Sequence, residues 1–321
     1  MTTAPGTPPT GRFAPSPTGP LHLGSLVAAL GSWLSARAKG GLWLVRMEDL
    51  DAPRVIPGAA DDILRTLERF GLGWDGDVVF QSERLPLYEA AFEDLFRKEE
   101  VYACACSRAD IARAASAPIS EEEGVSSNMG SREGRPLALA GPVYPGTCRP
   151  ELPRGGIARA FRFRVPPGLF TFKDLLFGSL SEDVEKAVGD FVVKRADGPY
   201  AYQLAVVVDD AAQGVTEVVR GADLLGSTAR QIALQRALSL PTPSYAHLPL
   251  VVGPDGKKLG KRDGALALET LKEPRVRGAL AFALRALGQD PAEGPPREML
   301  EEARLRFDPG RVPREPRMAP R

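Results

Sequence analysis

The stretch Gly11–Ser25 constrains the fold of this chain more than any other, because a proline-rich turn in it opens directly into a helical pattern. Three prolines and one glycine lie between residues 15 and 20 and favour an open turn. Apolar residues then recur at helical spacing from Leu23 to Leu34, and Gly40 and Gly41 end the pattern. We therefore expect a loop that leads straight into a helix.

The first turn of this expected helix is a candidate phosphate-binding site. The first backbone amides of a helix have no internal acceptor and carry the positive end of the helix dipole. His22, Gly24 and Ser25 lie at that position, and Gly24 would let a phosphate or a base come close to the backbone. The alternative is an ordinary loop before an amphipathic helix, which is the better interpretation when His-x-Gly-Ser is considered alone.

A second candidate motif is the basic loop Lys258–Arg262, far along the chain. Attack of a carboxylate on the α-phosphate of ATP builds negative charge on the departing pyrophosphate. Mobile ammonium groups neutralise that charge more in the transition state than in the ground state. A basic loop considered alone is usually only a solvated turn. The joint occurrence of both motifs favours the catalytic interpretation.

Both motifs resemble the signatures of the class I glutamyl-tRNA synthetases. From Arg12 the chain reads Arg-Phe-Ala-Pro-Ser-Pro-Thr-Gly-Pro-Leu-His-Leu-Gly, and from Lys258 it reads Lys-Leu-Gly-Lys-Arg. The second stretch is similar to the Lys-Met-Ser-Lys-Ser loop of that family, with Gly260 at the position of the serine. Glycine keeps the loop flexible but removes a hydroxyl, so the resemblance carries over the role of Lys261 and not the contact of the serine.

The amino-acid site can be argued from charge. Glutamate has two carboxylates and one ammonium group, so its pocket needs two cationic or donor groups and one acidic group, which Arg12, Arg220 and Glu48 supply. Which arginine takes which carboxylate stays open, and each residue considered alone could be a surface charge or a core tyrosine. The resemblance implies a larger glutamate-binding set: Arg12, Phe13, Ala14, Pro15, Ser16, Glu48, Tyr202 and Arg220.

The resemblance also implies an ATP site. Its catalytic residues are His22 and Lys261. Mg²⁺ is expected to accompany the ATP. The full ATP-binding set is His22, Gly24, Ser25, Lys258 and Lys261.

The three cysteines of the chain are Cys104, Cys106 and Cys148, which cannot all pair and which fit a reducing compartment and metal ligation. Together with Tyr144 they resemble the zinc site of the glutamyl-queuosine tRNA(Asp) synthetases, in which three thiolates and a phenolate would complete a tetrahedron. The gap between Cys106 and Tyr144 is far longer than in that family, and a loop can grow between fixed ends at small entropic cost. The alternative is three buried, reduced cysteines.

Alternating strand and helix patterns predict an α/β fold with a doubly wound parallel sheet, Rossmann-like as in class I synthetases. We expect a catalytic domain formed by residues 12–101 and 191–250, with an inserted zinc-bearing, acceptor-binding subdomain at 102–190. Residues 251–321 are expected to hold the basic loop and a short helical region that contacts the RNA stem. Residues 1–11 are expected to be a disordered extension.

The periodicity also predicts individual elements. Strands are expected at residues 42–46 and 215–220, and alternating apolar residues at 160–180 predict a small separate sheet. Residues 200–210 could be strand or helix. Ser227 is a candidate N-cap. Helices are expected at residues 59–70, 85–98, 227–240, 276–287 and 297–305.

Composition restricts the classes of partner. Lys and Arg together number 41, as do Asp and Glu, so any contact with a nucleic acid must come from local patches rather than from net charge. The chain has no signal-like stretch at its start and no apolar run long enough to span a membrane. We therefore expect a cytoplasmic protein without a membrane partner, and a monomer.

The resemblance extends from Gly11 to about Leu287 and is nearest to the glutamyl-queuosine tRNA(Asp) synthetases in the stretches Asp49–Ala59 and Gly71–Val78. It implies activation of glutamate with ATP and transfer to queuosine in the anticodon of tRNA(Asp). Two alternatives stay open: a short glutamyl-tRNA synthetase that charges a tRNA 3′ end, and a non-enzymatic RNA-binding relative. The residues after Lys261 are too few for an added anticodon-binding domain, so we expect the queuosine-bearing anticodon stem-loop to enter the active site.

Overall fold

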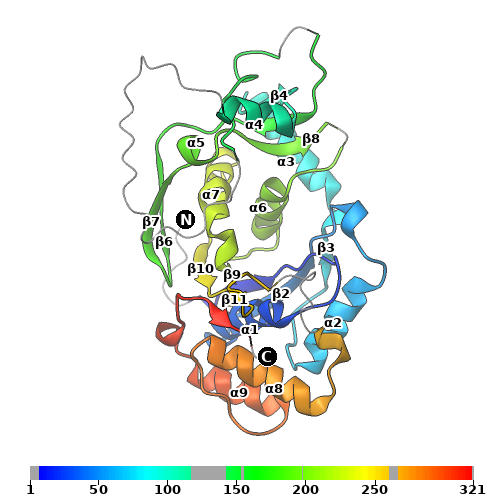
Figure 1. Ribbon diagram of the computed structural model, residues 1–321, viewed down its shortest axis with the longest axis vertical. Helices are drawn as coiled ribbons and strands as arrows, with labels where there is room; N and C mark the ends of the chain where they lie inside the picture. Colours follow the sequence, from blue (N-terminus) through cyan, green and yellow to red (C-terminus); the bar gives the residue numbers. More distant parts are fainter. Residues whose placement is uncertain (1–6, 117–141, 153–154, 197, 260–266, 320–321) are drawn as a thin grey trace.

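The computed structural model describes residues 7–116, 142–152, 155–196, 198–259 and 267–319. A parallel sheet lies at the centre of its lower half in Figure 1. Three parallel strands of this sheet pair in the order β1 (Thr10–Phe13), β2 (Leu42–Met47) and β3 (Val79–Phe80). Strand β2 has a near-continuous apolar sequence, which is typical of a parallel strand that is covered on both faces.

A second sheet continues the first. Its strands are ordered β7 (Gly178–Asp183), β6 (Leu169–Asp174), β10 (Ser244–Leu248) and β9 (Glu217–Gly221). Pairing is parallel between β6, β10 and β9, and antiparallel between β6 and β7. The backbone amide of Thr216 donates to the carbonyl of Thr10 at 2.9 Å, so the two sheets meet where β9 lies beside β1.

Helices cover both faces of the joined sheets (Figure 1). One hydrophobic core includes Val219 and Ala246 and the helices on one face: α1 (Leu23–Arg37), α2 (Ala59–Arg69), α8 (Glu273–Ala286) and α9 (Pro296–Arg306). The other core includes Val218 and Tyr245 and the helices on the opposite face: α3 (Leu85–Arg97), α6 (Tyr202–Ala212) and α7 (Thr228–Ala237). Adjacent residues of one strand therefore enter opposite cores. The predicted α/β class is confirmed.

A smaller antiparallel sheet lies at the other end of the molecule, at the top of Figure 1. It consists of β4 (Val101–Cys104), β5 (Ala160–Phe163) and β8 (Phe191–Arg195), with α4 (Arg108–Ser116) and α5 (Val184–Ala187) near it. The strands that form this sheet are not the ones that the predicted domain boundaries imply. The predicted boundaries put β8 in the catalytic domain, but β8 pairs in the small sheet. They put β6 and β7 in the insertion, but these strands extend the large sheet. Apolar alternation identifies a strand but not the distant strand with which it pairs.

Most of the helices match their predicted ranges within a few residues. The ambiguous stretch 200–210 forms α6, since its apolar run is buried on nearly all sides. Ser227 is the N-cap residue of α7 as predicted, but its side chain forms no capping hydrogen bond, because its hydroxyl instead accepts from Gln203 and Arg230. Strand β1 begins at Thr10, inside the range 1–11 that was predicted to be disordered; residues 1–6 lie outside the described part.

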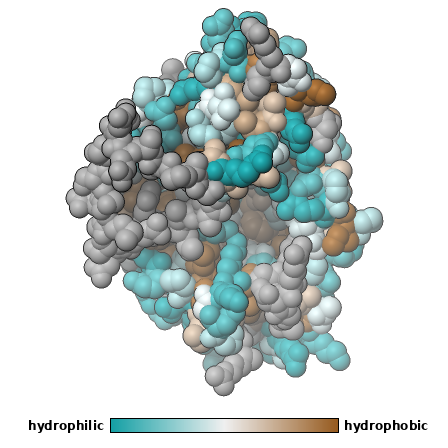
Figure 2. Space-filling model, turned by 45° about the horizontal axis from the view of Figure 1, so that its top comes forward, coloured by the Kyte–Doolittle hydropathy of each residue, from teal (hydrophilic) through white to brown (hydrophobic). Residues whose placement is uncertain are grey.

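The remaining elements are short. Strands β11 (Val251–Val252) and β12 (Arg317–Met318) pair with each other. None of the helices in the described part of the chain is both long and apolar enough to cross a lipid bilayer. Hydrophilic side chains cover much of the described surface in the view of Figure 2, with hydrophobic side chains in separate groups. The short 3₁₀ helices are η1 (Ala52–Arg54), η2 (Gln81–Glu83), η3 (Ala222–Ser227), η4 (Leu268–Thr270) and η5 (Pro309–Arg311).

Gly41 offers a test of how β1 is held beside β2. A Cβ atom at this position would lie 2.1 Å from the carbonyl oxygen of Pro9, which is a backbone atom and cannot turn aside. We expect Gly41→Ala to lower the free energy of unfolding by about 1–3 kcal/mol in chemical denaturation. Gly73→Ala, where an added Cβ would meet nothing within 4 Å, is the control and should change it by less than about 0.5 kcal/mol. Equal stability of the two variants would contradict this packing.

Candidate active site

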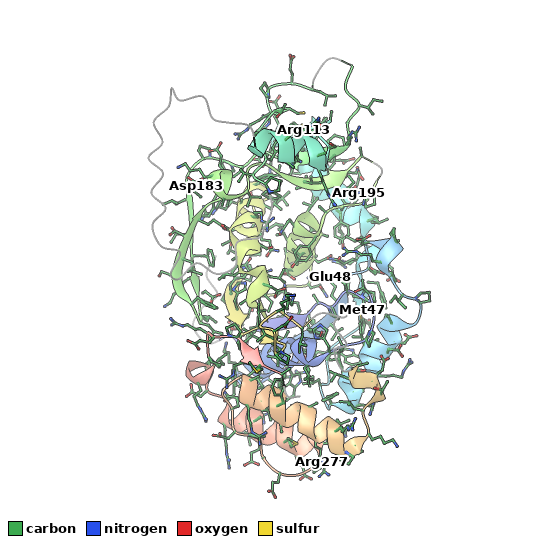
Figure 3. The ribbon with its side chains drawn as sticks, in the orientation of Figure 1. Met47, Glu48, Arg113, Asp183, Arg195 and Arg277 are labelled. Carbon is green, nitrogen blue, oxygen red and sulfur yellow. The ribbon has the colours of Figure 1, made fainter. Side chains whose placement is uncertain are left out.

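A cleft of about 910 Å³ opens between the large sheet and the region that carries the small sheet. Every predicted substrate-binding residue in the described part of the chain lines it. Figure 3 shows Glu48 near the middle of the molecule, just after β2, and Arg195 on the side toward the small sheet. Lys261 and Gly260 lie outside the described residues. The predicted residues on the wall are Arg12, Phe13, Ala14, Pro15, Ser16, His22, Gly24, Ser25, Glu48, Tyr202, Arg220 and Lys258.

The N-terminus of α1 forms one wall of the cleft. His22 is the N-cap residue, and its ring Nδ1 accepts a hydrogen bond from the backbone amide of Ser25 at 3.3 Å. A Cβ atom at Gly24 would lie 3.0 Å from the His22 ring, so glycine is the residue that best lets the ring lie over the first turn. The predicted loop-to-helix junction is confirmed, and Gly24 and Ser25 of its first turn line the cleft.

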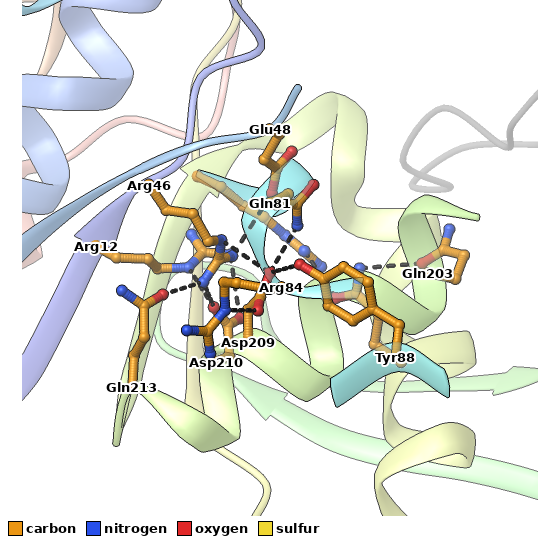
Figure 4. A network of polar contacts seen from close by, with 12 residues as sticks. Arg12, Arg46, Glu48, Gln81, Arg84, Tyr88, Gln203, Asp209, Asp210 and Gln213 are labelled. Atoms are coloured by element: carbon orange, nitrogen blue, oxygen red, sulfur yellow. Dashed lines mark hydrogen bonds and ion pairs between the residues drawn. The ribbon is translucent and has the colours of Figure 1, made fainter. Parts of the chain in front are cut away.

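Arg12 and Arg46 converge on one buried carboxylate (Figure 4). Arg12 donates to both oxygens of Asp210, from Nε at 3.2 Å and from Nη2 at 3.4 Å. Arg46 Nη1 donates to the same group at 2.8 Å, and Arg46 Nη2 lies 3.5 Å from Oε1 of Glu48. Burial would raise the pKa of Asp210, but the two guanidinium groups outweigh it and hold that pKa below its usual range.

The neighbouring Asp209 collects a second set of donors (Figure 4). Its carboxylate accepts from Gln81 at 2.8 Å, from Arg84 at 2.6 Å and from the Tyr88 hydroxyl at 2.7 Å. Arg46 Nε lies 3.7 Å away. The two aspartates therefore tie α6 to β2, η2 and α3 by charged hydrogen bonds in a buried region.

Glu48 and Tyr202 line the cleft, whereas Asp209 and Asp210 do not. Burial raises the pKa of Glu48 above its ordinary value, although Arg46 and Arg12 oppose the shift. Burial also raises the pKa of Tyr202, with Glu48 adding to the effect. A cationic ligand group beside Glu48 would stabilise its ionised form.

Arg220 enters the cleft from the end of β9 and is held by neutral partners. Its Nη1 donates to Gln231 Oε1 at 2.8 Å, its Nη2 donates to Thr228 Oγ1 at 2.9 Å, and its Nε donates to His247 Nε2 at 3.1 Å. Arg220 is only 4% exposed and has no carboxylate within ion-pair distance among the residues that the structure describes. A buried guanidinium without a counterion favours binding of an anionic ligand.

His247 is itself held by Asp174. The distance from His247 Nδ1 to Asp174 Oδ2 is 2.6 Å, and both side chains are fully buried. Burial lowers the pKa of His247 to about 4. Burial would raise the pKa of Asp174, but hydrogen bonds from His247 and from the backbone amides of Phe177 and Leu176 hold it below its usual range. The imidazole is therefore neutral at physiological pH.

Lys258 is the one lysine of the basic loop whose surroundings are described at the cleft. It lines the wall and forms an ion pair with Asp223, which follows β9. Its side chain is half exposed, so this pair is weak and open to exchange for a bound anion.

The three cysteines converge at the small sheet. Their sulfur atoms lie within 4.8 Å of one another, and Cys106 Sγ is 3.6 Å from Cys148 Sγ. The Tyr144 hydroxyl lies 3.4 Å from Cys104 Sγ. These separations suit tetrahedral ligation, in which zinc–sulfur bonds are about 2.3 Å long. Burial would raise the pKa of Cys104, but its hydrogen bonds with Tyr144 and Arg162 outweigh the burial and lower that pKa.

Sequence reasoning missed several residues of the site. Arg46 ends an apolar strand, and Asp209 and Asp210 end the apolar run 202–210, so charge in an apolar context was the available signal. Asp174 and His247 have no such local signal, because their contact depends on the pairing of strands that are far apart in the sequence. Further residues without a sequence signal are Gln81, Arg84, Tyr88, Thr228 and Gln231.

Comparison with known proteins agrees with this geometry. The model of the family "tRNA synthetases class I (E and Q), catalytic domain" matches residues 10–295. A crystal structure of a glutamate tRNA ligase from Elizabethkingia meningosepticum, in complex with its amino acid, has a TM-score of 0.73 at 25% identity and covers 97% of this chain and 67% of that chain. The chain belongs to the class I tRNA synthetases and is a ligase of that class.

Relatives that align over most of this chain identify the family more closely. A glutamyl-Q tRNA(Asp) synthetase of Geobacter sulfurreducens is 53% identical over 315 residues, which are 96% of this chain and 95% of that protein. One from Burkholderia cenocepacia is 56% identical over 262 residues, 81% of this chain and 82% of that protein. Within its class, the chain belongs to the glutamyl-Q tRNA(Asp) synthetases.

The neutral, buried His247 predicts a pH dependence of stability. In the folded chain its pKa is about 4, against an ordinary value of 6.5, so between these values the unfolded chain binds a proton that the folded chain does not. The free energy of unfolding should therefore fall as pH falls from 6.5 to 4, by on the order of 3 kcal/mol from this group. Urea denaturation at several pH values measures it. The stability of the parent relative to His247→Gln should fall over this interval and become constant below pH 4, and a difference that does not vary with pH would contradict the assignment.

Proposed function

We propose that this chain activates glutamate with ATP and transfers the glutamyl group to the queuosine nucleoside in the anticodon of tRNA(Asp). The observation that carries the proposal is the convergence of Arg12, Glu48 and Arg220 in one cleft beside the N-terminus of α1. Two guanidinium groups and one carboxylate match the two carboxylates and one ammonium group of glutamate. The names of the relatives support tRNA(Asp) as the acceptor.

Glutamate would bind between the two arginines. Asp210 accepts one N–H each from Nε and Nη2 of Arg12, so the second N–H of Nη2 and the two of Nη1 are the donors that would face a substrate carboxylate. Arg220 would take the second carboxylate, and the choice between the α- and γ-carboxylates stays open. Glu48 would pair with the ammonium group, and the Tyr202 hydroxyl lies on the same wall. The loop Phe13–Ser16 would close the pocket along the backbone.

ATP would bind with its phosphates at the first turn of α1, where His22, Gly24 and Ser25 line the cleft. The positive end of the helix dipole favours anions there. The ammonium group of Lys258 would leave Asp223 and bind the phosphates instead. We propose from the sequence motif that Lys261 stabilises the departing pyrophosphate. Mg²⁺ bound to the phosphates would neutralise part of their charge.

The reaction has two steps. A carboxylate oxygen of glutamate attacks the α-phosphorus of ATP and pyrophosphate leaves, which gives glutamyl-adenylate. A hydroxyl of the queuosine cyclopentenediol then attacks the activated carbonyl carbon and AMP leaves. The contribution of the protein to both steps is orientation of the reactants and stabilisation of the developing charge.

The experiment that tests the proposal is acylation with labelled glutamate. With ATP present, queuosine-containing tRNA(Asp) and its isolated anticodon stem-loop should both accept glutamate. The same tRNA without queuosine is the matched control and should accept none, because it lacks the nucleophilic diol. Glutamylation of the 3′ end of tRNA(Glu), with none on the stem-loop, would decide for a short glutamyl-tRNA synthetase. Absence of glutamate-dependent pyrophosphate exchange would decide for a non-enzymatic relative.

We also propose that Cys104, Cys106, Cys148 and Tyr144 hold one structural zinc ion. Three sulfur atoms and a phenol oxygen lie close enough to act as its ligands, and all four belong to the region of the small sheet. Arg162 donates to Cys104 Sγ at 3.2 Å and stacks on the Tyr144 ring at 3.8 Å, which places positive charge beside the anionic ligands. Bound zinc would crosslink segments that are far apart in the sequence.

Metal analysis tests the zinc site. Protein purified under reducing, chelator-free conditions should contain about one zinc per chain, and a Cys104→Ser/Cys106→Ser double variant should contain none. Tyr144→Phe keeps the ring under Arg162 but removes the fourth ligand, so it should lose zinc to a competing chelator sooner than the parent. The parent protein without zinc would favour three buried, reduced cysteines instead.

A further inference from the structure

Arg220 is the end of a hydrogen-bonded chain that crosses three adjacent strands. Asp174 ends β6, His247 lies in β10, and Arg220 lies in β9. His247 is paired directly with Arg220 in the parallel register, and Asp174 is paired with Tyr245, two residues before His247. Side chains two residues apart on a strand share a face, so the three polar groups line up across the sheet.

From this alignment we propose that Asp174 and His247 are positioning residues for glutamate, because they fix the direction in which the Arg220 guanidinium faces the substrate. The inference rests on the proposed function, in which Arg220 binds a carboxylate of glutamate. Neither residue lines the cleft, so both would act through Arg220. We call the three residues the Asp174–His247–Arg220 relay.

The direction of each hydrogen bond in the relay is determined by chemistry. An arginine Nε always carries hydrogen, so His247 Nε2 can only be an acceptor at 3.1 Å from it. The proton of the neutral imidazole must then be on Nδ1, where Asp174 Oδ2 accepts it at 2.6 Å. The other oxygen, Oδ1, accepts from the backbone amides of Leu176 and Phe177, both at 2.9 Å, which holds the carboxylate in place.

The relay leaves part of Arg220 available to the substrate. A guanidinium has five N–H donors, and the partners of Arg220 in the described part of the chain take one each on Nε, Nη1 and Nη2. One donor therefore remains on each Nη atom, which is the pair that binds a carboxylate in a bidentate manner. With His247 in the other tautomer, two N–H groups would face each other and the guanidinium would have to turn.

The variant Asp174→Asn separates positioning from packing. The introduced amide has the size of the carboxylate, and its oxygen can still accept from Leu176 and Phe177. Its NH₂ group then faces His247 Nδ1 and selects the tautomer with hydrogen on Nε2, which is the wrong one for Arg220. We expect the KM for glutamate in pyrophosphate exchange to rise about 10- to 100-fold, the range for losing a hydrogen bond to a charged group, while the KM for ATP stays within about twofold.

Glu217→Gln is the matched control. Glu217 is also a buried carboxylate, lies in β9 three residues before Arg220, and binds Ser35 and Lys39 away from the cleft. This variant can lose stability but should keep the parental KM for glutamate. His247→Gln gives a second comparison, because a glutamine offers one acceptor to Arg220 and one donor to Asp174. It should raise the KM for glutamate much less than His247→Leu, which offers neither.

Nitrogen NMR on protein labelled at histidine observes the tautomer directly. The chain contains only two histidines, His22 and His247, so their signals can be assigned with a single His22→Gln variant. His247 should carry its proton on Nδ1 in the parent and on Nε2 in Asp174→Asn. This measurement does not depend on the identity of the substrate.

The outcomes separate the relay from the proposed function. A tautomer change together with a selective rise in the KM for glutamate supports the relay. An unchanged tautomer, an unchanged KM, or an equal KM rise in Glu217→Gln overturns it while glutamate-dependent exchange by the parent still supports the proposed function. A parent without such exchange overturns both.

Discussion

The two aspartates at the C-terminal half of α6 are the constraint on which the site depends. Asp210 binds Arg12 of β1 and Arg46 of β2, while Asp209 binds Arg84 and other donors that precede or begin α3. Moving charged groups out of water is costly unless each finds a partner of opposite sign. The balanced network therefore permits charged residues at the ends of β1 and β2, where the substrate cleft needs them. Loss of Asp210 would remove the carboxylate that binds Arg12, and loss of Asp209 would remove the one that binds Arg84.

Charge and the family resemblance indicated the residues that line the cleft. Local patterns in the sequence predicted the α/β class and the loop-to-helix junction at His22. These features are predictable because each is encoded within about fifteen residues, by a turn, a cap or an apolar period. The family resemblance indicated that Cys104, Cys106, Cys148 and Tyr144 lie together, and the structure brings the three sulfur atoms within 4.8 Å of one another. The role of Lys261 remains an expectation from its motif.

Features that depend on distant pairing were not predictable in the same way. The alternation at residues 160–180 identified strands, but β5 joins the small sheet and β6 joins the large one. Asp174 looks like any polar residue at the end of a strand. Its role depends on β10 lying beside β6, which brings His247 next to it. The same applies to Asp209, whose partners are more than a hundred residues away in sequence. Such contacts are set by the assembled sheet, which a single sequence does not display.

The two arginines of the cleft differ in a way that bears on substrate choice. Arg12 already has a carboxylate partner, so a substrate carboxylate adds to an existing pair. Arg220 has only neutral acceptors in the described part of the chain, and the neutral His247 keeps it so. A ligand that brings a carboxylate to Arg220 compensates a buried charge, while an uncharged amide of the same shape leaves that charge uncompensated. Discrimination against uncharged analogues thus follows from holding a cation with dipoles rather than with a counterion, and residues of strand β10 and helix α7 supply those dipoles.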